Sequence, residues 1–293
     1  MPRRDRALDI ESPVEAEECW MVVDGIRMRY LRVGSGPPLV LLHGLLGYSF
    51  SWRFNMDAFA EHRTVYAVDM PGAGLSGRSM QLDVSFRGSA LRVLRFADQL
   101  GLERFDLLGT SHGGAVASLA TAIGNEQSSA RVQRLILVAP VNPWSAHGRQ
   151  LAALVSGPLM SGLLGHSIVY CRFAHRLVVR RLYGDARRIA PGTVEGYSKP
   201  YRVPGSFEHL FKILRSWKDD LKDLENSLAK LGDLPVLLLW GDQDTAVNPD
   251  SAPRLARCFR DANLVILPGV GHLPYEEVPQ EFNAAVLKFL LAL

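Results

Sequence analysis

The stretch "DLLGTSHGG", residues 106–114, decides how this chain is organised. An apolar run stops at Gly109, Ser111 stands between Gly109 and Gly113, and the small-residue stretch "GGAVASLATAIG" follows. A strand that turns sharply into a helix crowds the positions two residues before and after the turn, so only small residues fit there. The middle residue is then held in a strained backbone conformation. We therefore predict a strand, a tight turn and a helix, with the Ser111 hydroxyl presented at the turn.

Similar apolar runs recur along the chain and predict further strands. They lie at 37–44, 64–70, 105–111, 134–140, 235–241 and 262–269. Continuous rather than alternating runs suit strands buried on both faces, as in a parallel sheet. Helical patterns lie between or after them at 85–102, 113–124, 251–260 and 280–293. This alternation predicts an α/β fold with a mostly parallel sheet flanked by helices. Two alternating runs around Asp24-Gly25 predict a hairpin before it.

One segment interrupts the alternation and suggests a second unit. Residues 142–225 contain no clear strand, and their best helical patterns are at 148–164 and 206–217. We predict a helical cap over 142–225, inserted into a core formed by 19–141 and 226–293. Residues 1–18 are expected to form a loose tail.

Composition excludes several other classes of protein. The chain has 293 residues, 47% of them hydrophobic, and a net charge of +3, which does not favour nucleic-acid binding. No apolar run is long enough for a transmembrane segment or a secretory signal. The three cysteines are widely spaced, which predicts reduced thiols and no metal site. These features predict a cytoplasmic protein, and they leave its oligomeric state open.

A serine hydroxyl is a weak nucleophile unless a base activates it. His272 follows the last predicted strand and is the candidate base, since none of His62, His147, His166, His175 and His209 has a comparable setting. The loop "WGDQD" offers Asp242 and Asp244 as the acid that orients the base. We favour Asp244 because it lies further from the strand and can reach the histidine, whereas Asp242 can cap the turn.

Cleavage of an acyl bond also requires donors for the oxyanion. In a strand–turn–helix arrangement of this kind, one donor is the backbone N–H after the nucleophile, here that of His112. The second comes from the loop after "LVLLHG", where Gly44 permits a turn and the Leu45 N–H is the natural donor. The His112 side chain either lines the substrate pocket or only packs against the cap.

Taken in order, these motifs resemble those of the α/β-hydrolase superfamily across residues 20–293. The matching pieces are His43-Gly44 with Trp52 downstream, "DMPGAGLS" (69–76), "GTSHGG" (109–114), "WGDQD" (240–244) and "GHLPYEEVP" (271–279). The resemblance implies an eight-stranded sheet with a helical cap inserted after the sixth strand. It also implies an enzyme that needs no metal or organic cofactor.

The resemblance narrows the chemistry further. Epoxide hydrolases and haloalkane dehalogenases of this superfamily carry Asp at the nucleophile position, where this chain has Ser111. We predict a serine hydrolase that cleaves an ester, or a related acyl bond, of a small and apolar substrate through an acyl-enzyme. The alternatives are a C–C bond hydrolase of a diketone-type substrate, an acyltransferase, a cofactor-free haloperoxidase and a non-catalytic ligand-binding protein. The predicted substrate contacts are Leu46, Trp52, Trp144, Val247 and Leu273.

The predicted cap contains an arginine-rich segment at 171–188. Its arginines are Arg172, Arg176, Arg180, Arg181, Arg187 and Arg188. They form either a solvated helix face or a surface that attracts anionic substrates, carriers or membranes.

Overall fold

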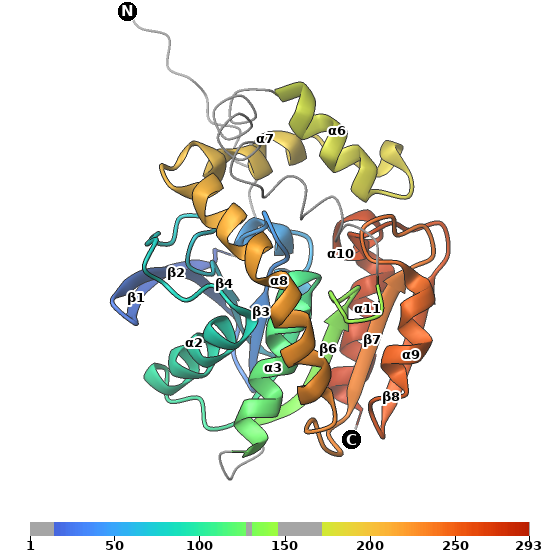
Figure 1. The fold of residues 1–293 in the computed structure, drawn as a ribbon. Coiled ribbons are helices and arrows are strands. Elements are labelled where there is room, and N and C mark those ends of the chain that lie inside the picture. The colour runs from blue at the N-terminus through green and yellow to red at the C-terminus, as the bar shows by residue number, and fades with distance from the viewer. Residues whose placement is uncertain (1–14, 127–130, 146–171, 293) are drawn as a thin grey trace, which may run out of the picture.

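The computed structural model describes residues 15–126, 131–145 and 172–292. Its centre is one eight-stranded sheet with the strand order β1-β2-β4-β3-β5-β6-β7-β8 (Figure 1). The strands are β1 (Glu17–Val23), β2 (Ile26–Val33), β3 (Pro38–Leu42), β4 (Thr64–Val68), β5 (Phe105–Thr110), β6 (Val132–Val138), β7 (Val236–Gly241) and β8 (Ala262–Leu267). The fold class and the position of every predicted strand are thereby confirmed.

In the strand order, the sheet is parallel from β4 to β8, and β2 alone runs in the opposite direction, antiparallel to both of its neighbours β1 and β4. Strands β4, β5 and β7 are buried along their whole length, which explains their unbroken apolar sequence. The edge strand β8 is largely half-exposed. The β1–β2 hairpin turns at Asp24 and Gly25, both with positive φ (53° and 73°), as a tight hairpin turn requires.

Helices cover both faces of the sheet. One face carries α2 (Phe86–Gln99), α3 (His112–Glu126), α8 (Ser206–Leu228) and α9 (Ala252–Ala256), and the other carries α1 (Met56–Ala60) and α11 (Pro279–Leu291). The helices predicted at 85–102, 113–124 and 280–293 are present with slightly different ends. The pattern at 251–260 forms only the short α9, preceded by the 3-10 turn η4 (Pro249–Ser251). The predictions omitted the short α1, η1 (Ser49–Trp52) and α10 (Pro274–Glu277).

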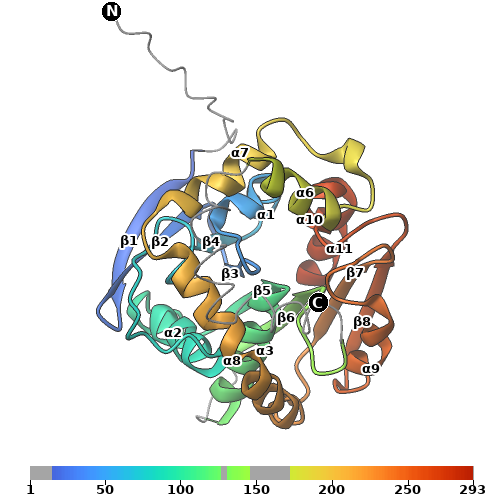
Figure 2. The same ribbon diagram turned by 45° about the horizontal axis from the view of Figure 1, so that its top comes forward.

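A helical segment between β6 and β7 covers the carboxyl edge of the sheet (Figure 2). Its described elements are α6 (Arg172–Leu182), η2 (Ala186–Arg188), α7 (Thr193–Ser198), η3 (Lys199–Arg202) and α8. We call residues 172–228 the cap. The helix predicted at 206–217 is the first half of α8, while the pattern at 148–164 and most of the predicted tail lie outside the described residues. Strand β1 begins at Glu17, inside the predicted tail.

Two adjacent carboxylates in α10 tie the cap to the core. Glu276 is buried and accepts a hydrogen bond from Arg53 at 2.7 Å, from Tyr183 at 2.7 Å and from Tyr197. Glu277 is also buried and accepts from the backbone N–H groups of Gly271 and Asp185. The two tyrosines and Asp185 belong to the cap. These contacts therefore fix it relative to the loop that carries His272.

Removing the Glu276 carboxylate should destabilise the protein strongly. The Arg53 side chain is only 8% exposed, so Glu276→Ala leaves a buried cation without its ion-pair partner. Such losses cost about 3–5 kcal/mol. Chemical denaturation of wild type and variant measures the cost, with the exposed Glu281→Ala as the control for removing an acidic residue nearby. A cost below about 1 kcal/mol, as for an exposed pair, would contradict this account.

Candidate active site

Ser111 lies at the sharp turn between β5 and α3 in a left-handed backbone conformation. Its φ is +52°, which is uncommon for a residue other than glycine. Hydrogen bonds of the neighbouring backbone hold this conformation. The Ser111 N–H donates to the Val138 carbonyl at 2.9 Å, and the Ser111 carbonyl accepts from Gly114 and Val141 at 3.0 Å each. The strained turn is thus fastened to the adjacent strand β6.

The glycines around Ser111 are required by close backbone contacts. A Cβ atom at Gly109 would lie 2.3 Å from the Gly113 carbonyl oxygen, and one at Gly113 would lie 2.4 Å from the His43 carbonyl oxygen. Real Cβ atoms do not approach backbone this closely. At Gly44 the nearest atom would be the Ser111 Cβ, at 3.2 Å. These close contacts explain why glycine occupies both flanking positions of the G-x-S-x-G pattern, as the sequence predicted.

His272 and Asp244 form a buried pair on the loops after β8 and β7. The His272 Nδ1 lies 2.7 Å from the Asp244 Oδ2, and both residues are about 5% exposed. The other oxygen of Asp244 accepts the N–H groups of Ala246 and Val247 at 2.7 and 2.9 Å, which orients the carboxylate. Asp242 does not contact the histidine. Its carboxylate accepts the Gly269 N–H at 2.7 Å and stabilises the loop instead.

The loop that carries His272 is packed against the cap. The His272 N–H donates to the Leu182 carbonyl at 2.7 Å, at the end of α6. A Cβ atom at Gly271 would lie 2.4 Å from that same carbonyl oxygen and from the Gly184 nitrogen. Glycine at position 271 is therefore needed for the cap to come this close.

Among the described residues, the backbone N–H groups of His112, the first residue of α3, and of Leu45, in the loop after β3, donate no hydrogen bond. His43 fixes this loop: its Nδ1–H donates to the Gly44 carbonyl at 2.8 Å, and its Nε2 accepts the Met70 N–H at 3.0 Å. The next residue, Leu46, has a positive φ of 65°, so the loop is itself strained. His112 is also at the N-terminus of α3, and a helix N-terminus favours negative charge beside it.

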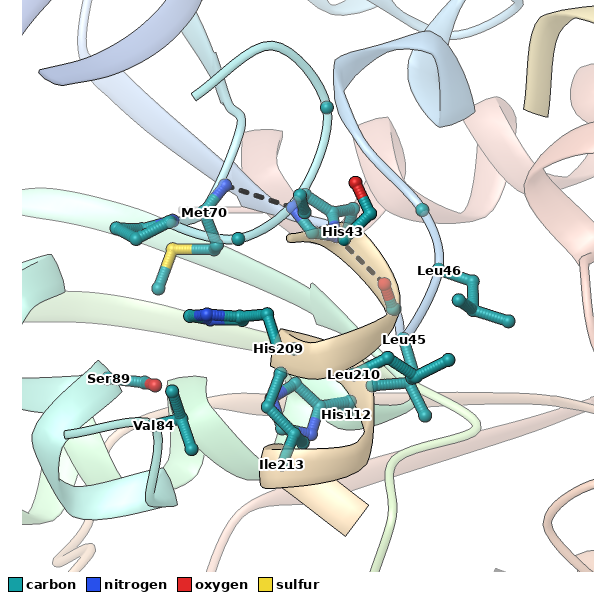
Figure 3. A pocket seen from close by; sticks show the side chains of 18 of the residues that line it. His43, Leu45, Leu46, Met70, Val84, Ser89, His112, His209, Leu210 and Ile213 are labelled. Carbon is teal, nitrogen blue, oxygen red and sulfur yellow. Dashed lines mark hydrogen bonds between the residues drawn. The ribbon is translucent and has the colours of Figure 1, made fainter. Parts of the chain in front are cut away.

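A largely apolar cavity lies beside the turn at Ser111, under the cap (Figure 3). Its wall includes Gly44, Leu45 and Leu46 from the loop after β3, and His112 and Gly113 from the start of α3. The loop after β4, the start of α2, η3 and the first half of α8 contribute the rest of the wall. Ser111 itself is not among the lining residues, so the cavity begins next to it.

Two histidines of the cavity wall are held neutral by burial. Burial lowers the pKa of His112 to about 3, and the ring packs between Phe86 and Trp217. Burial also lowers the pKa of His209 to about 4, and nearby Arg78 contributes. In both rings the Nδ1 is buried and has no hydrogen-bond partner among the described residues. His209 was not singled out from the sequence, because nothing local marks a histidine in an amphipathic helix as pocket-lining.

The predicted substrate contacts do not all lie at this cavity. Leu46 lines it, whereas Trp144, Val247 and Leu273 are not among its lining residues. Trp52 has no exposed surface and packs against Tyr275 with a ring separation of 4.9 Å. The structure thus places Trp52 in the core, a position that its sequence context allowed equally well, and its role as a substrate contact stays a prediction.

The arginine-rich segment is only partly free. Arg187 pairs with Asp185 at 2.7 Å, and Arg188 donates to the Gly269 carbonyl at 3.0 Å, whereas the Arg176 and Arg180 side chains are exposed. Within the described ranges, no group of three or more metal-ligating side chains occurs. No helix in those ranges has the length and apolar character of a membrane span. Cys19 and Cys258 are free thiols, and Cys171 lies outside the described residues.

Comparison with known proteins identifies the family. Residues 37–279 match the family model described as the alpha/beta hydrolase fold. The chain therefore belongs to the α/β-hydrolase family, as its motifs and its sheet indicate.

Its relatives have different activities. The chain is 29% identical to haloalkane dehalogenase 2 of Mycobacterium tuberculosis, over 93% of this chain and 94% of that protein. It is 28% identical to 2-hydroxy-6-oxo-2,4-heptadienoate hydrolase of Pseudomonas putida, over 95% of this chain and 98% of that protein. It is 29% identical to the acetyltransferase component of the acetoin cleaving system of Pseudomonas putida, over 92% of this chain and 68% of that protein. Among solved structures, a bacterial membrane phospholipase A has a TM-score of 0.80 at 25% identity, covering 94% of this chain and 86% of that one.

The low pKa of His209 predicts a loss of stability in mild acid. An unfolded histidine titrates near 6.5, whereas His209 in the fold stays neutral down to pH about 4. Its contribution to stability is therefore present above pH 6.5 and falls progressively as the pH drops toward 4.

Between pH 7 and 5, this effect removes about 2 kcal/mol of unfolding free energy. Denaturation of wild type and His209→Gln at both pH values measures it, with the exposed His62→Gln as a control. The pH-dependent loss should be smaller by that amount in His209→Gln alone. An identical loss in all three proteins would contradict the assignment.

Proposed function

We propose that this protein is a serine hydrolase that cleaves a carboxylic ester or a related acyl bond through an acyl-enzyme. Ser111 attacks the carbonyl carbon, His272 accepts the hydroxyl proton and passes it to the leaving group, and Asp244 orients the imidazole. Water then attacks the acyl-enzyme with His272 again as the base, which releases the acid and restores the serine. The protein belongs to a family of hydrolases, and this specific chemistry is our inference.

The hydrogen bond between His272 and Asp244 carries the proposal. A bond from Nδ1–H to a buried carboxylate leaves the Nε2 of the ring as the proton acceptor. The unpartnered N–H groups of Leu45 and His112 supply the donors that a tetrahedral oxyanion needs. Among the described residues, Ser111 is the only serine with a positive φ, and His272 lies on the loop after β8, at the same carboxyl edge of the sheet.

Cleavage of a carbon–carbon bond next to a carbonyl is the second candidate. The similarity to 2-hydroxy-6-oxo-2,4-heptadienoate hydrolase spans nearly both chains and favours it. The serine at position 111 argues against dehalogenation, because the resemblance places aspartate at that position in dehalogenases. Acyl transfer and peroxide-dependent halogenation would use the same residues with another acceptor in place of water, so product analysis with alcohol or peroxide separates them.

A panel of p-nitrophenyl esters from acetyl to palmitoyl tests ester cleavage. Wild type should hydrolyse at least one ester, and Ser111→Ala should lower kcat by about 10⁴-fold or more while the protein stays folded. The preferred acyl length then measures the space beside Ser111. Equal rates for the two proteins on every ester would contradict ester hydrolysis and favour a C–C hydrolase of narrow specificity or a binding protein.

The two aspartates of the loop after β7 provide a matched pair of variants. Asp244→Asn should lower kcat/KM by about 10⁴-fold, because the histidine loses the carboxylate that orients it. Asp242→Asn should stay close to wild type, since its carboxylate only accepts the Gly269 N–H. If Asp242→Asn is the more damaging change, the acid is wrongly assigned.

A further inference from the structure

The cavity wall formed by the loop after β4 and the start of α8 has an unusual charge pattern. The titratable side chains that line the cavity are Arg78, Arg92, Tyr201 and three histidines, and no Asp or Glu is among them. Arg92 pairs with Asp24 at 3.3 Å. Arg78, by contrast, has no ion-pair partner in the described part of the chain. The carboxylate whose charge acts on Arg78 is that of Asp69, which is already ion-paired with Arg29 at 3.3 Å. The wall thus presents one cation without an ion-pair partner of its own.

The contacts of Arg78 leave donors available. Its Nε donates to the Ser206 hydroxyl at 3.0 Å, its Nη2 to the Gly74 carbonyl at 2.9 Å and its Nη1 to the Ser76 carbonyl. Each terminal nitrogen of a guanidinium carries a second N–H, which these bonds do not use. All three partners are neutral, and burial lowers the pKa of Arg78, in the direction expected where desolvation outweighs nearby negative charge. The guanidinium is therefore pre-positioned but forms no direct ion pair.

His209 marks the same wall as a place for a polar group. It is 2% exposed, lines the cavity and contacts the Gly72 backbone so closely that a Cβ there would lie 1.8 Å from its ring. Its Nδ1 is buried without a partner. Figure 3 shows its ring beside Met70, near His112. A buried polar atom without a partner costs about 1–3 kcal/mol. A carboxylate, which only accepts hydrogen bonds, relieves this cost in the tautomer that carries the proton on Nδ1.

We propose that this wall is an anion site, and that the substrate carries a carboxylate which Arg78 binds while the reacting carbonyl lies at Ser111. This inference rests on the proposed hydrolase function and adds the substrate class: acyl compounds with a second, ionised acid group. Arg78 is then a specificity-determining residue. A carboxylate bound to a pre-positioned guanidinium forms charge-assisted hydrogen bonds, which are about twice as strong as neutral ones.

Calorimetry on the Ser111→Ala protein tests binding without turnover. The ligands are the monomethyl esters of succinate, glutarate and adipate. Each is compared with a neutral methyl ester that lacks the second carboxylate: methyl butanoate, methyl pentanoate and methyl hexanoate, respectively. At the best chain length, the charged ligand should bind about 10- to 100-fold more tightly than its neutral counterpart. Equal affinity for charged and neutral ligands at every length would overturn the proposal.

Variants of Arg78 separate recognition from a structural role. Arg78→Met should abolish the preference for the charged ligand and leave the affinity for the neutral one unchanged, while Arg78→Lys keeps part of the preference. Arg87→Met removes an exposed arginine that pairs with Asp223 outside the cavity, and it should keep the full preference. Equal weakening of both ligands by Arg78→Met would show that Arg78 only holds the loop, and would overturn the proposal.

The outcome is independent of catalysis. If Arg78→Met does not fold, Arg78→Gln, which keeps hydrogen-bond donors without the charge, replaces it with the same expectations. A half-ester that binds through Arg78 but is never cleaved by wild type would contradict the proposed hydrolase and leave the anion site standing. Cleavage of neutral esters with no preference for half-esters would do the reverse.

Discussion

The left-handed backbone at Ser111 is the constraint on which the arrangement of the site depends. A turn this tight is possible only because Gly109 and Gly113 let β5, α3 and the His43 backbone approach within distances that exclude a Cβ atom. Hydrogen bonds to Val138 and Val141 then fasten the turn to the next strand. The strained conformation costs about 1–3 kcal/mol for such a residue, and the contacts of the surrounding sheet offset this cost. Because the turn is this tight, the N-terminus of α3 and the loop after β3 lie beside the serine.

A second set of contacts couples the histidine loop to the cap. The Leu182 carbonyl accepts from the His272 N–H, and Glu277 bridges Gly271 and Asp185. The preceding residue, Glu276, accepts hydrogen bonds from Arg53 and from two tyrosines of the cap. The helix that contributes these carboxylates begins two residues after His272. The position of the proposed base is therefore determined jointly by the core sheet and by the cap that encloses the cavity.

Much of this arrangement follows from local sequence. Unbroken apolar runs predicted the parallel strands because both faces of β4, β5 and β7 are buried. The G-x-S-x-G pattern predicted the turn because its glycines are sterically required. Asp244 and His272 could be paired because both follow strands that end at the same edge of the sheet.

Other parts depend on contacts between distant segments, which local patterns do not encode. Trp52 packs against Tyr275, and His209 reaches the cavity only because α8 returns over the sheet edge. That Arg78 has no direct ion-pair partner likewise becomes visible only when its neutral partners, such as the Gly74 carbonyl and the Ser206 hydroxyl, are known. For the same reason, the sequence suggested an apolar substrate, whereas the charges around the cavity favour an anionic one.

The proposed chemistry requires Ser111 to be a nucleophile that His272 activates. Reaction with a fluorophosphonate, followed by mass spectrometry of the intact protein and its peptides, tests this without knowledge of the substrate. We expect a single adduct on the peptide that contains Ser111, formed rapidly by wild type and much more slowly by His272→Ala. An unmodified Ser111, or labelling that does not depend on His272, would contradict it.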